Sequence, residues 1–283
     1  MHGGAGAVAG RNYDSVEKHL RTLAEECEAL LAKGCCALDV VESAVTEMER
    51  SGMYVAGRGS APNSTGYVEL DASIMHGPSR EAGAVAALPG FESPIQVARG
   101  VMEKTPHVLL TGPGAVAFAR ENGYVKVEDP ASYYVVPVGV NKDELTDSSA
   151  HGTVGAVALD RSGALAAATS TGGTFGKLEG RVGDTPLIGL GTWADDEIAI
   201  SCTGIGEHII RAGGALSIAC AFKSGVELET AINDMLNEVK RLGGDAGVIA
   251  VTRNARLATL YNSDGMKRAS VSTQQPLQVT TFN

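Results

Sequence analysis

The sequence predicts an α+β fold in which two β-sheets are stacked between layers of helices, a four-layer αββα sandwich. Three observations predict it: two consecutive amphipathic helices near the start, a central pair of Val- and Ala-rich strands joined at Gly163, and two later helices followed by a closing hairpin. Helices and sheets each bury one apolar face against another layer. With 283 residues, the chain is long enough for one large core, and we expect a single domain over 1–283.

The first helix begins at Asp14 or Ser15, which suit a helix cap, and ends at Gly34. A second helix is predicted over 37–50. Both show apolar residues at helical spacing on one face. These residues are Val16, Leu20, Leu23, Cys27, Leu30 and Leu31 in the first helix, and Leu38, Val41, Val45 and Met48 in the second.

The later elements follow from period-two patterns and from turn residues. Signals weaken from 124 to 152, where Pro130, Pro137 and acidic residues predict a linker. We expect strands over 68–75, 82–88, 107–111, 154–159, 164–171, 186–190 and 197–203, helices over 94–104, 113–121, 206–222 and 226–242, and a closing hairpin over 246–251 and 257–262.

Composition excludes several classes of function. A net charge of −10 argues against nucleic acid or an anionic membrane as partner. The sequence has no uninterrupted apolar run long enough to predict a membrane-spanning helix. The five cysteines do not form a disulfide framework, so we expect reduced thiols and a cytoplasmic protein. The sequence contains no His-Glu-x-x-His or paired Cys-x-x-Cys motif, and we expect no catalytic metal and no cofactor. The stretch 172–178 lacks the spacing of a nucleotide-binding loop.

A threonine stands where the linker becomes a strand. A polar, poorly periodic run over 141–149 ends shortly before Thr153, and the strand follows at once. If the Gly152–Thr153 bond were cut, Thr153 would carry a free α-amine beside its own hydroxyl, a nucleophile and its base in one residue. An α-amine titrates near ~7.7–8.0, so much of it would be a base at neutral pH. The alternative is an ordinary threonine at the start of a strand.

Further motifs follow Thr153 in a fixed order. They are Thr169-Ser170-Thr171-Gly172-Gly173, then Gly180-Arg181-Val182-Gly183-Asp184, then Ser201-Cys202-Thr203-Gly204-Ile205-Gly206-Glu207. With His2-Gly3-Gly4-Ala5-Gly6 at the start and Gly265-Met266-Lys267-Arg268-Ala269 near the end, this set resembles the N-terminal-nucleophile (Ntn) hydrolases of the plant-type L-asparaginase and isoaspartyl peptidase family. The resemblance covers nearly the whole chain and implies an Ntn-type sandwich.

The resemblance also implies a maturation step and a catalytic set. Cleavage before Thr153 would leave an α subunit of 1–152, including the linker over about 124–152, and a β subunit of 153–283. Thr153 would be the nucleophile, Thr171 would hold its hydroxyl, and Thr203 with Gly204 would form the oxyanion hole, where one donor is typically worth ~10²–10³ in rate. We expect a homodimer of such cleaved αβ protomers.

Arg181 and Asp184 would hold the substrate. At the level of single residues they predict no more than a surface ion pair. The family reading has Arg181 bind the α-carboxylate through its two-pronged guanidinium group, and Asp184 bind the α-ammonium together with the Gly206 carbonyl. Thr203 and Gly204 would complete the contacts. The side-chain carbonyl of an L-aspartyl unit would then face Thr153.

The resemblance further implies a structural sodium ion held by backbone carbonyls after the second helix. The alternative is an unliganded loop at a helix end. The matching positions are Met48, Glu49, Ser51, Tyr54, Ala56 and Arg58.

Two positions are informative. Gly152 separates branches of the superfamily, and Val55 departs from the usual family pattern. Gly152 matches asparaginase/isoaspartyl peptidases, whereas lysosomal glycosylasparaginases and taspase-like proteases carry Asp there. Val55 replaces a usual Asn near the substrate, which alters the expected leaving-group preference. Family members also carry a short apolar strand before His2, so we expect a sheet without this segment or a trimmed chain.

The sequence therefore predicts a self-cleaving threonine amidohydrolase that acts on small β-aspartyl substrates, namely β-aspartyl dipeptides and L-asparagine. Two alternatives stay open. One is a dipeptidase narrowed to a single class such as the β-Asp-Arg unit of cyanophycin. The other is an uncleaved, inactive homologue that binds aspartate.

Overall fold

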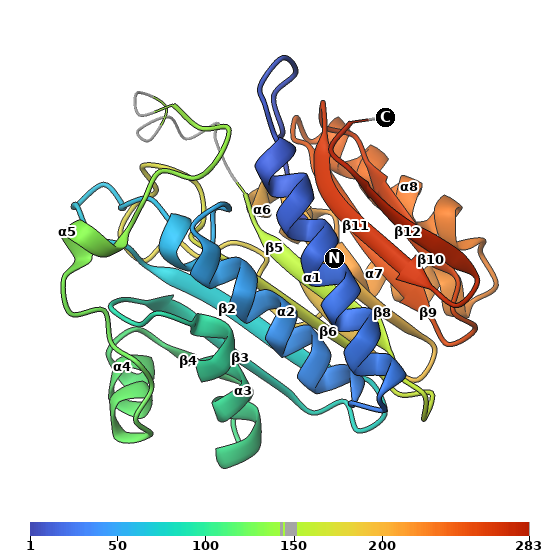
Figure 1. Cartoon of the computed structure of the whole chain (residues 1–283), viewed down its shortest axis with the longest axis horizontal. Helices are drawn as coiled ribbons and strands as arrows, with labels where there is room; N and C mark the ends of the chain where they lie inside the picture. Colours follow the sequence, from blue (N-terminus) through green and yellow to red (C-terminus); the bar gives the residue numbers. More distant parts are fainter. Residues whose placement is uncertain (142–143, 145–151, 283) are drawn as a thin grey trace.

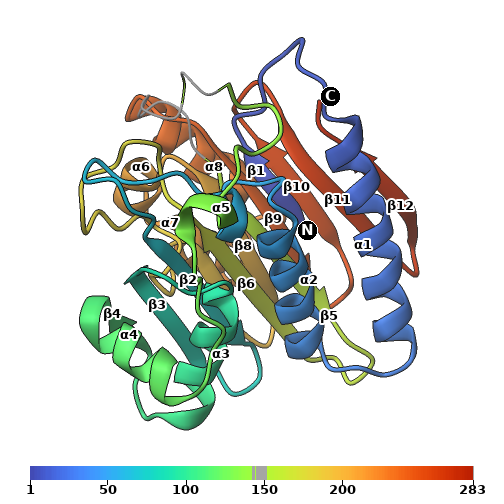
Figure 2. The same ribbon diagram turned by 60° about the vertical axis from the view of Figure 1, so that its left-hand side comes forward.

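A computed structural model describes residues 1–141, 144 and 152–282. Two sheets lie face to face with helices on both outer sides (Figures 1 and 2). The larger sheet has the order β12(Gln275–Thr280), β11(Met266–Ser272), β1(His2–Ala5), β5(Val154–Leu159), β6(Leu165–Thr171), β2(Leu70–His76), β3(Ala82–Leu88) and β4(Leu109–Thr111). The smaller sheet has the order β10(Leu257–Tyr261), β9(Ala246–Thr252), β8(Ile198–Gly204) and β7(Thr192–Ala194).

Helices cover the outer face of each sheet. On the larger sheet, α1(Asp14–Ala32), α2(Ala37–Ser51) and α3(Pro94–Lys104) pack through one apolar core. On the smaller sheet, α6(Gly206–Arg211), α7(Gly214–Lys223) and α8(Leu228–Arg241) pack through a second. The remaining elements are α4(Gly112–Glu121), α5(Pro130–Tyr133) and the 3₁₀ turn η1(Gly57–Gly59).

The two sheets meet through small side chains. This interface contains Ala167 and Leu165 of β6, Ala199 of β8 and Val251 of β9. Alanines let the sheets approach closely, and the three separate cores correspond to the three junctions of a four-layer sandwich. The predicted αββα architecture is confirmed.

Most predicted elements are confirmed, with three corrections. The stretch 186–190 is a series of turns rather than a strand, because Gly189 has a positive φ and the Asp184 carbonyl accepts turn hydrogen bonds from the Leu187 and Gly191 amides. The helix expected over 206–222 is broken at Gly213 and Gly214, which both adopt positive φ. A C-terminal hairpin, β11 with β12, was not predicted and joins the larger sheet beside β1.

Strands β5 and β6 form the expected antiparallel pair, with Val154 opposite Ser170 and Leu159 opposite Leu165. The predicted linker of about 124–152 contains α5, and its residues 142–143 and 145–151 lie outside the described residues. Thr153 therefore stands immediately before a central strand of the larger sheet.

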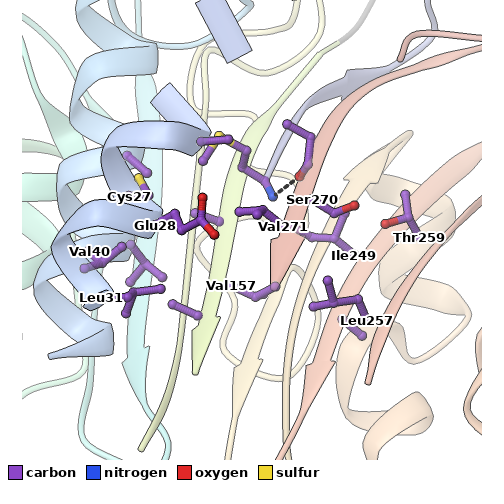
Figure 3. Close-up of a pocket in the computed structure, with 18 of the residues that line it drawn as sticks. Cys27, Glu28, Leu31, Val40, Val157, Ile249, Leu257, Thr259, Ser270 and Val271 are labelled. Carbon is purple, nitrogen blue, oxygen red and sulfur yellow. Dashed lines mark hydrogen bonds between the residues drawn. The ribbon is translucent and has the colours of Figure 1, made fainter. Parts of the chain in front are cut away.

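Strand β1 is shorter than its neighbours. It pairs with β5 at His2 opposite Gly155, and with β11 at His2 opposite Arg268. Both neighbours run on beyond this pair, and a cavity of about 80 Å³ lies there (Figure 3), lined by Cys27, Val157 and Val271 among others. This cavity is lined by residues of β5 and β11 and by Met1.

Candidate active site

The structure brings Thr153 and Thr171 together. The Thr153 Oγ1 donates to Thr171 Oγ1 at 3.3 Å, and Thr171 Oγ1 in turn donates to the Gly152 carbonyl at 2.6 Å. The Gly173 amide donates to the same Thr171 oxygen at 2.9 Å. Both threonines are buried, so Thr171 is held in place and contacts both the proposed nucleophile and the carbonyl of the bond to be cut.

The glycine-rich first strand lies directly against the proposed nucleophile, Thr153. A Cβ on Gly4, which has φ +99°, would come within 3.0 Å of the Thr153 carbonyl oxygen and 3.1 Å of its nitrogen. Gly4 thus permits a backbone approach that a larger residue would block. The neighbouring Ala5 amide donates to Thr203 Oγ1 at 3.1 Å, which places Thr203 beside the same segment.

Thr203 and Gly204 end strand β8. Because the Ala5 amide already donates to the Thr203 oxygen, the Thr203 hydroxyl keeps its own proton for another acceptor. Thr203 is fully buried, and Gly204 has φ +140°, where a Cβ would lie 2.4 Å from the Asp245 carbonyl. This arrangement leaves a hydroxyl donor at the strand end, as an oxyanion hole requires.

Asp184 has the electrostatics of a cation site. Its side chain is 4% exposed, and Oδ2 has no hydrogen-bond partner in the part of the chain that the structure describes. Burial raises the pKa of the Asp184 carboxyl to about 7, while the Arg181 charge acts in the opposite direction. A Cβ on Gly206 would lie 3.0 Å from Asp184 Oδ1, so the carboxyl group lies next to Gly206. An orphaned buried carboxylate fits a ligand ammonium.

Arg181 already has a carboxylate partner. Its Nε and one terminal nitrogen donate to Glu207 at 2.8 and 2.6 Å, a two-point contact. The other terminal nitrogen would lie 2.9 Å from a Cβ on Gly183 and 3.4 Å from one on Gly173. Sequence reasoning did not assign Glu207 a role. Glu207 fixes the guanidinium group, and the remaining terminal nitrogen lies next to Gly183 and Gly173.

Arg181 and Asp184 together form the proposed substrate clamp. Sequence reasoning also missed a buried lysine next to this clamp. Lys177 is 3% exposed, and its Nζ donates to the Glu69 carbonyl at 2.9 Å. A Cβ on Gly173 would meet that Nζ at 3.0 Å. Burial lowers the pKa of Lys177, and the buried carboxyl of Asp71 opposes this. A Gly-Lys pair in the loop after β6 was the available signal.

His2 lies between the two sheets and fills a structural position. Its Nε2 is 2.9 Å from Ser201 Oγ, and Ser201 Oγ is hydrogen-bonded to Thr169 Oγ1 at 2.8 Å. Thr192 donates to Thr169 at 2.5 Å, and Ser73 donates to Thr192 at 2.7 Å. Burial lowers the pKa of His2 to about 3, so the imidazole is neutral at physiological pH.

The predicted sodium loop is a tight turn in which glycines lie close to backbone carbonyl groups. A Cβ on Gly59 would lie 2.0 Å from the Tyr54 carbonyl, and one on Gly57 would lie 2.7 Å from the Glu49 carbonyl. The carbonyl groups of Met48, Ala56 and Arg58 accept bonds from Ser51, Gly59 and Val135. Each carbonyl oxygen has a second lone pair, which would be free to bind a cation. No group of three His, Cys, Asp or Glu suited to a metal occurs among the described residues.

A two-sheet sandwich between helical layers, with a threonine at the head of a central strand and a polar site around it, defines the class of Ntn hydrolases. A family model described as asparaginase matches residues 1–137 and 131–281. The chain belongs to this asparaginase family.

Curated proteins from several kingdoms resemble the whole chain. An isoaspartyl peptidase of Salmonella typhimurium is 41% identical over 95% of this chain and 93% of its own length. An isoaspartyl peptidase of Escherichia coli is 39% identical, over 95% and 91%. A plant-type L-asparaginase of Pyrobaculum calidifontis is also 39% identical, over 95% and 94%. No helix among the described residues is long and apolar enough to span a membrane.

Proposed function

We propose that this protein is a threonine amidohydrolase that cuts its own chain before Thr153 and then releases L-aspartate from β-aspartyl dipeptides and L-asparagine. The observation that carries the proposal is the contact of Thr171 with both Thr153 Oγ1 and the Gly152 carbonyl. Thr171 would polarise the bond that is cut, and it would then hold the nucleophile that the cut activates. The names of the relatives support the reaction and the substrates.

In the mature protein, Asp184 with the Gly206 carbonyl would bind the substrate ammonium, and Arg181 would bind its α-carboxylate. The α-amine of Thr153 takes the proton from Oγ1 as that oxygen attacks the β-carbonyl carbon. Thr203 and the Gly204 amide stabilise the oxyanion. The protonated α-amine then passes its proton to the leaving nitrogen, the carbon–nitrogen bond breaks, and a β-aspartyl ester of Thr153 forms. Water hydrolyses this ester and releases L-aspartate.

Three further properties belong to the proposal. The mature form is a homodimer of αβ protomers in the cytoplasm, as the sequence resemblance and the cysteine usage suggest. A structural sodium ion binds the carbonyl groups of the turn from Met48 to Arg58. A dipeptidase restricted to β-Asp-Arg is less well supported, because Val55, Ala61 and Phe175 form an apolar cluster beside the cleavage site.

Mass spectrometry of the purified protein, combined with an aspartate-release assay, tests the proposal. We expect two fragments, 1–152 and 153–283, and release of L-aspartate from β-Asp-Leu. A single intact chain that binds L-aspartate but releases none from any substrate would instead identify a binding protein. Size-exclusion chromatography with light scattering tests the dimer.

A further inference from the structure

The position of the future α-amine of Thr153 fixes where the leaving group must lie. That amine is the nitrogen now joined to Gly152, and in the proposed reaction it protonates the leaving nitrogen. The Gly152 Cα faces Val55, since a Cβ added there would be 2.8 Å from Val55 Cγ2. The leaving residue of a dipeptide must therefore emerge beside Val55.

Val55 is also one wall of a cavity of about 150 Å³. Phe175, Val138 and Val140 contribute further apolar walls, and Gly6 and Tyr54 complete this side. A dry cavity of comparable volume accommodates a benzene-sized group. The cavity is thus large enough for one apolar side chain, and it shares the Val55 wall with the bond to be broken.

A lysine ammonium without a counterion faces the same cavity. Lys267 of β11 is 7% exposed and lines the cavity. Its Nζ lies 5.5 Å from the centre of the Tyr13 ring and has no hydrogen-bond or ion-pair partner within residues 1–141, 144 and 152–282. Burial lowers the pKa of Lys267 to about 8. A buried charge without a partner is costly, and an incoming carboxylate would offset that cost.

The other charged groups of the cavity are already paired. Arg11 and Glu144 both line it and bind each other through two contacts. Hydrogen bonds from Arg11 lower the pKa of Glu144 to about 2, so its negative charge is taken by Arg11. Lys267 is left as the cation that can receive a ligand carboxylate.

We propose that this cavity is the subsite for the leaving residue of a β-aspartyl dipeptide, in which Lys267 binds the free α-carboxylate of that residue and the apolar walls take its side chain. The inference rests on the proposed function and specifies its substrates. Dipeptides that end in a free apolar residue are the preferred class. L-Asparagine, whose leaving group is ammonia, does not reach the subsite.

Three substrates test the subsite in the matured protein: β-Asp-Leu, its C-terminal amide, and L-asparagine. The wild-type protein should cleave the free acid with a kcat/KM about tenfold to a hundredfold above that of the amide, which is the range of one charge-assisted hydrogen bond. Lys267→Met should abolish this preference, and Lys267→Arg, the matched control, should retain most of it. All three proteins should hydrolyse L-asparagine equally well and show similar melting temperatures.

The outcomes separate the two proposals. Equal cleavage of acid and amide by the wild-type protein overturns the subsite without need of any variant, and so does a Lys267→Met protein that keeps the preference. In both cases aspartate is still released, so the proposed function stands. If none of the three substrates is cleaved by a protein that has matured, the proposed function fails and the subsite fails with it.

Discussion

The nucleophile region and the substrate clamp differ in how far their polar groups are already paired. Thr171 donates to Gly152 and accepts from Thr153 and Gly173. The hydrogen-bonding groups around the proposed nucleophile are therefore paired with one another. In the clamp, Arg181 is held by Glu207, while Asp184 Oδ2 has no partner among the described residues. The polar groups around Thr153 are thus paired with one another, whereas the substrate-binding pair combines a fixed Arg181 with an Asp184 carboxyl group that is left for a ligand.

The largest effect should come from removing the nucleophile. Thr153→Ala should remain one chain and release no detectable aspartate, a loss on the order of 10⁶ if it matches the removal of a serine nucleophile. The side chain is small, so the melting temperature should change little. A denaturing gel, mass spectrometry and the aspartate assay check this. Two fragments from this variant, or an N-terminus other than Thr153 in the wild-type protein, would refute the assignment.

The next largest effect on activity should come from removing Arg181, the cationic member of the substrate clamp. Arg181→Ala should lower kcat/KM for β-Asp-Leu by roughly a hundredfold or more, since a charge-assisted contact is lost. Glu207→Gln keeps Arg181 but loosens it, so we expect a two- to tenfold rise in KM with kcat nearly unchanged. Steady-state kinetics and melting curves measure both. A Glu207→Gln effect as large as that of Arg181→Ala would mean that Glu207 contacts substrate itself.

The Asp184 carboxyl group should make the binding of L-aspartate depend on pH. In the folded protein its pKa is about 7 against 3.8 unfolded, so the folded state binds more protons between these values and stability falls as pH rises through that window. Aspartate binding needs the ionised form, so affinity should fall about tenfold per pH unit below 7. Calorimetry of L-aspartate binding to the matured protein measures this directly, because L-aspartate is the reaction product and is not turned over.

Asp184→Asn, in the same matured form, is the matched control. It should bind aspartate weakly at every pH. Its melting temperature should exceed the parent's at pH 8 and match it near pH 4, because the cost of ionising a buried carboxyl is gone. If affinity for aspartate is independent of pH between 5 and 8, Asp184 is not the ammonium ligand.

The smallest effect should come from Val55, which adjoins Gly152 and lines the cavity of about 150 Å³. It is buried against Gly152, so Val55→Asn should lower the melting temperature. An amide near the leaving nitrogen should also narrow the preference for β-Asp-Leu over L-asparagine by about two- to tenfold. Val55→Ala removes the bulk without adding an amide. If both variants shift selectivity equally, the amide has no role.

The sequence predicted the layers well because amphipathic helices carry their own signal, as the apolar faces of α1 and α2 show. Strand β12 was missed because Pro276 weakens a strand pattern, and the fold tolerates it because β12 is an edge strand. The break at Gly213 and Gly214 was hidden because the apolar pattern continues through both helices.

Motif order placed Thr153, Thr171, Arg181 and Asp184 in one site. It could not show which groups were already paired. The contact between Arg181 and Glu207 joins residues distant along the chain, and so does the cavity that Lys267 and Val55 both line. Such contacts depend on how the strands are ordered in the sheet, and no local pattern records that order.

The order of strands in the larger sheet has a consequence for the life of the molecule. Strand β1 lies between β11 and β5, while β2, β3 and β4 follow β6. The proposed cleavage at Gly152–Thr153 would therefore give two polypeptides whose strands interleave within one sheet. Before the cut, folding is a first-order process. Afterwards, reassembly from the unfolded state needs an encounter of two chains and depends on their concentration. Maturation would therefore be hard to reverse. The chain must fold before it is cut, and a cut and unfolded protein would regain the folded state only by a slower, second-order process.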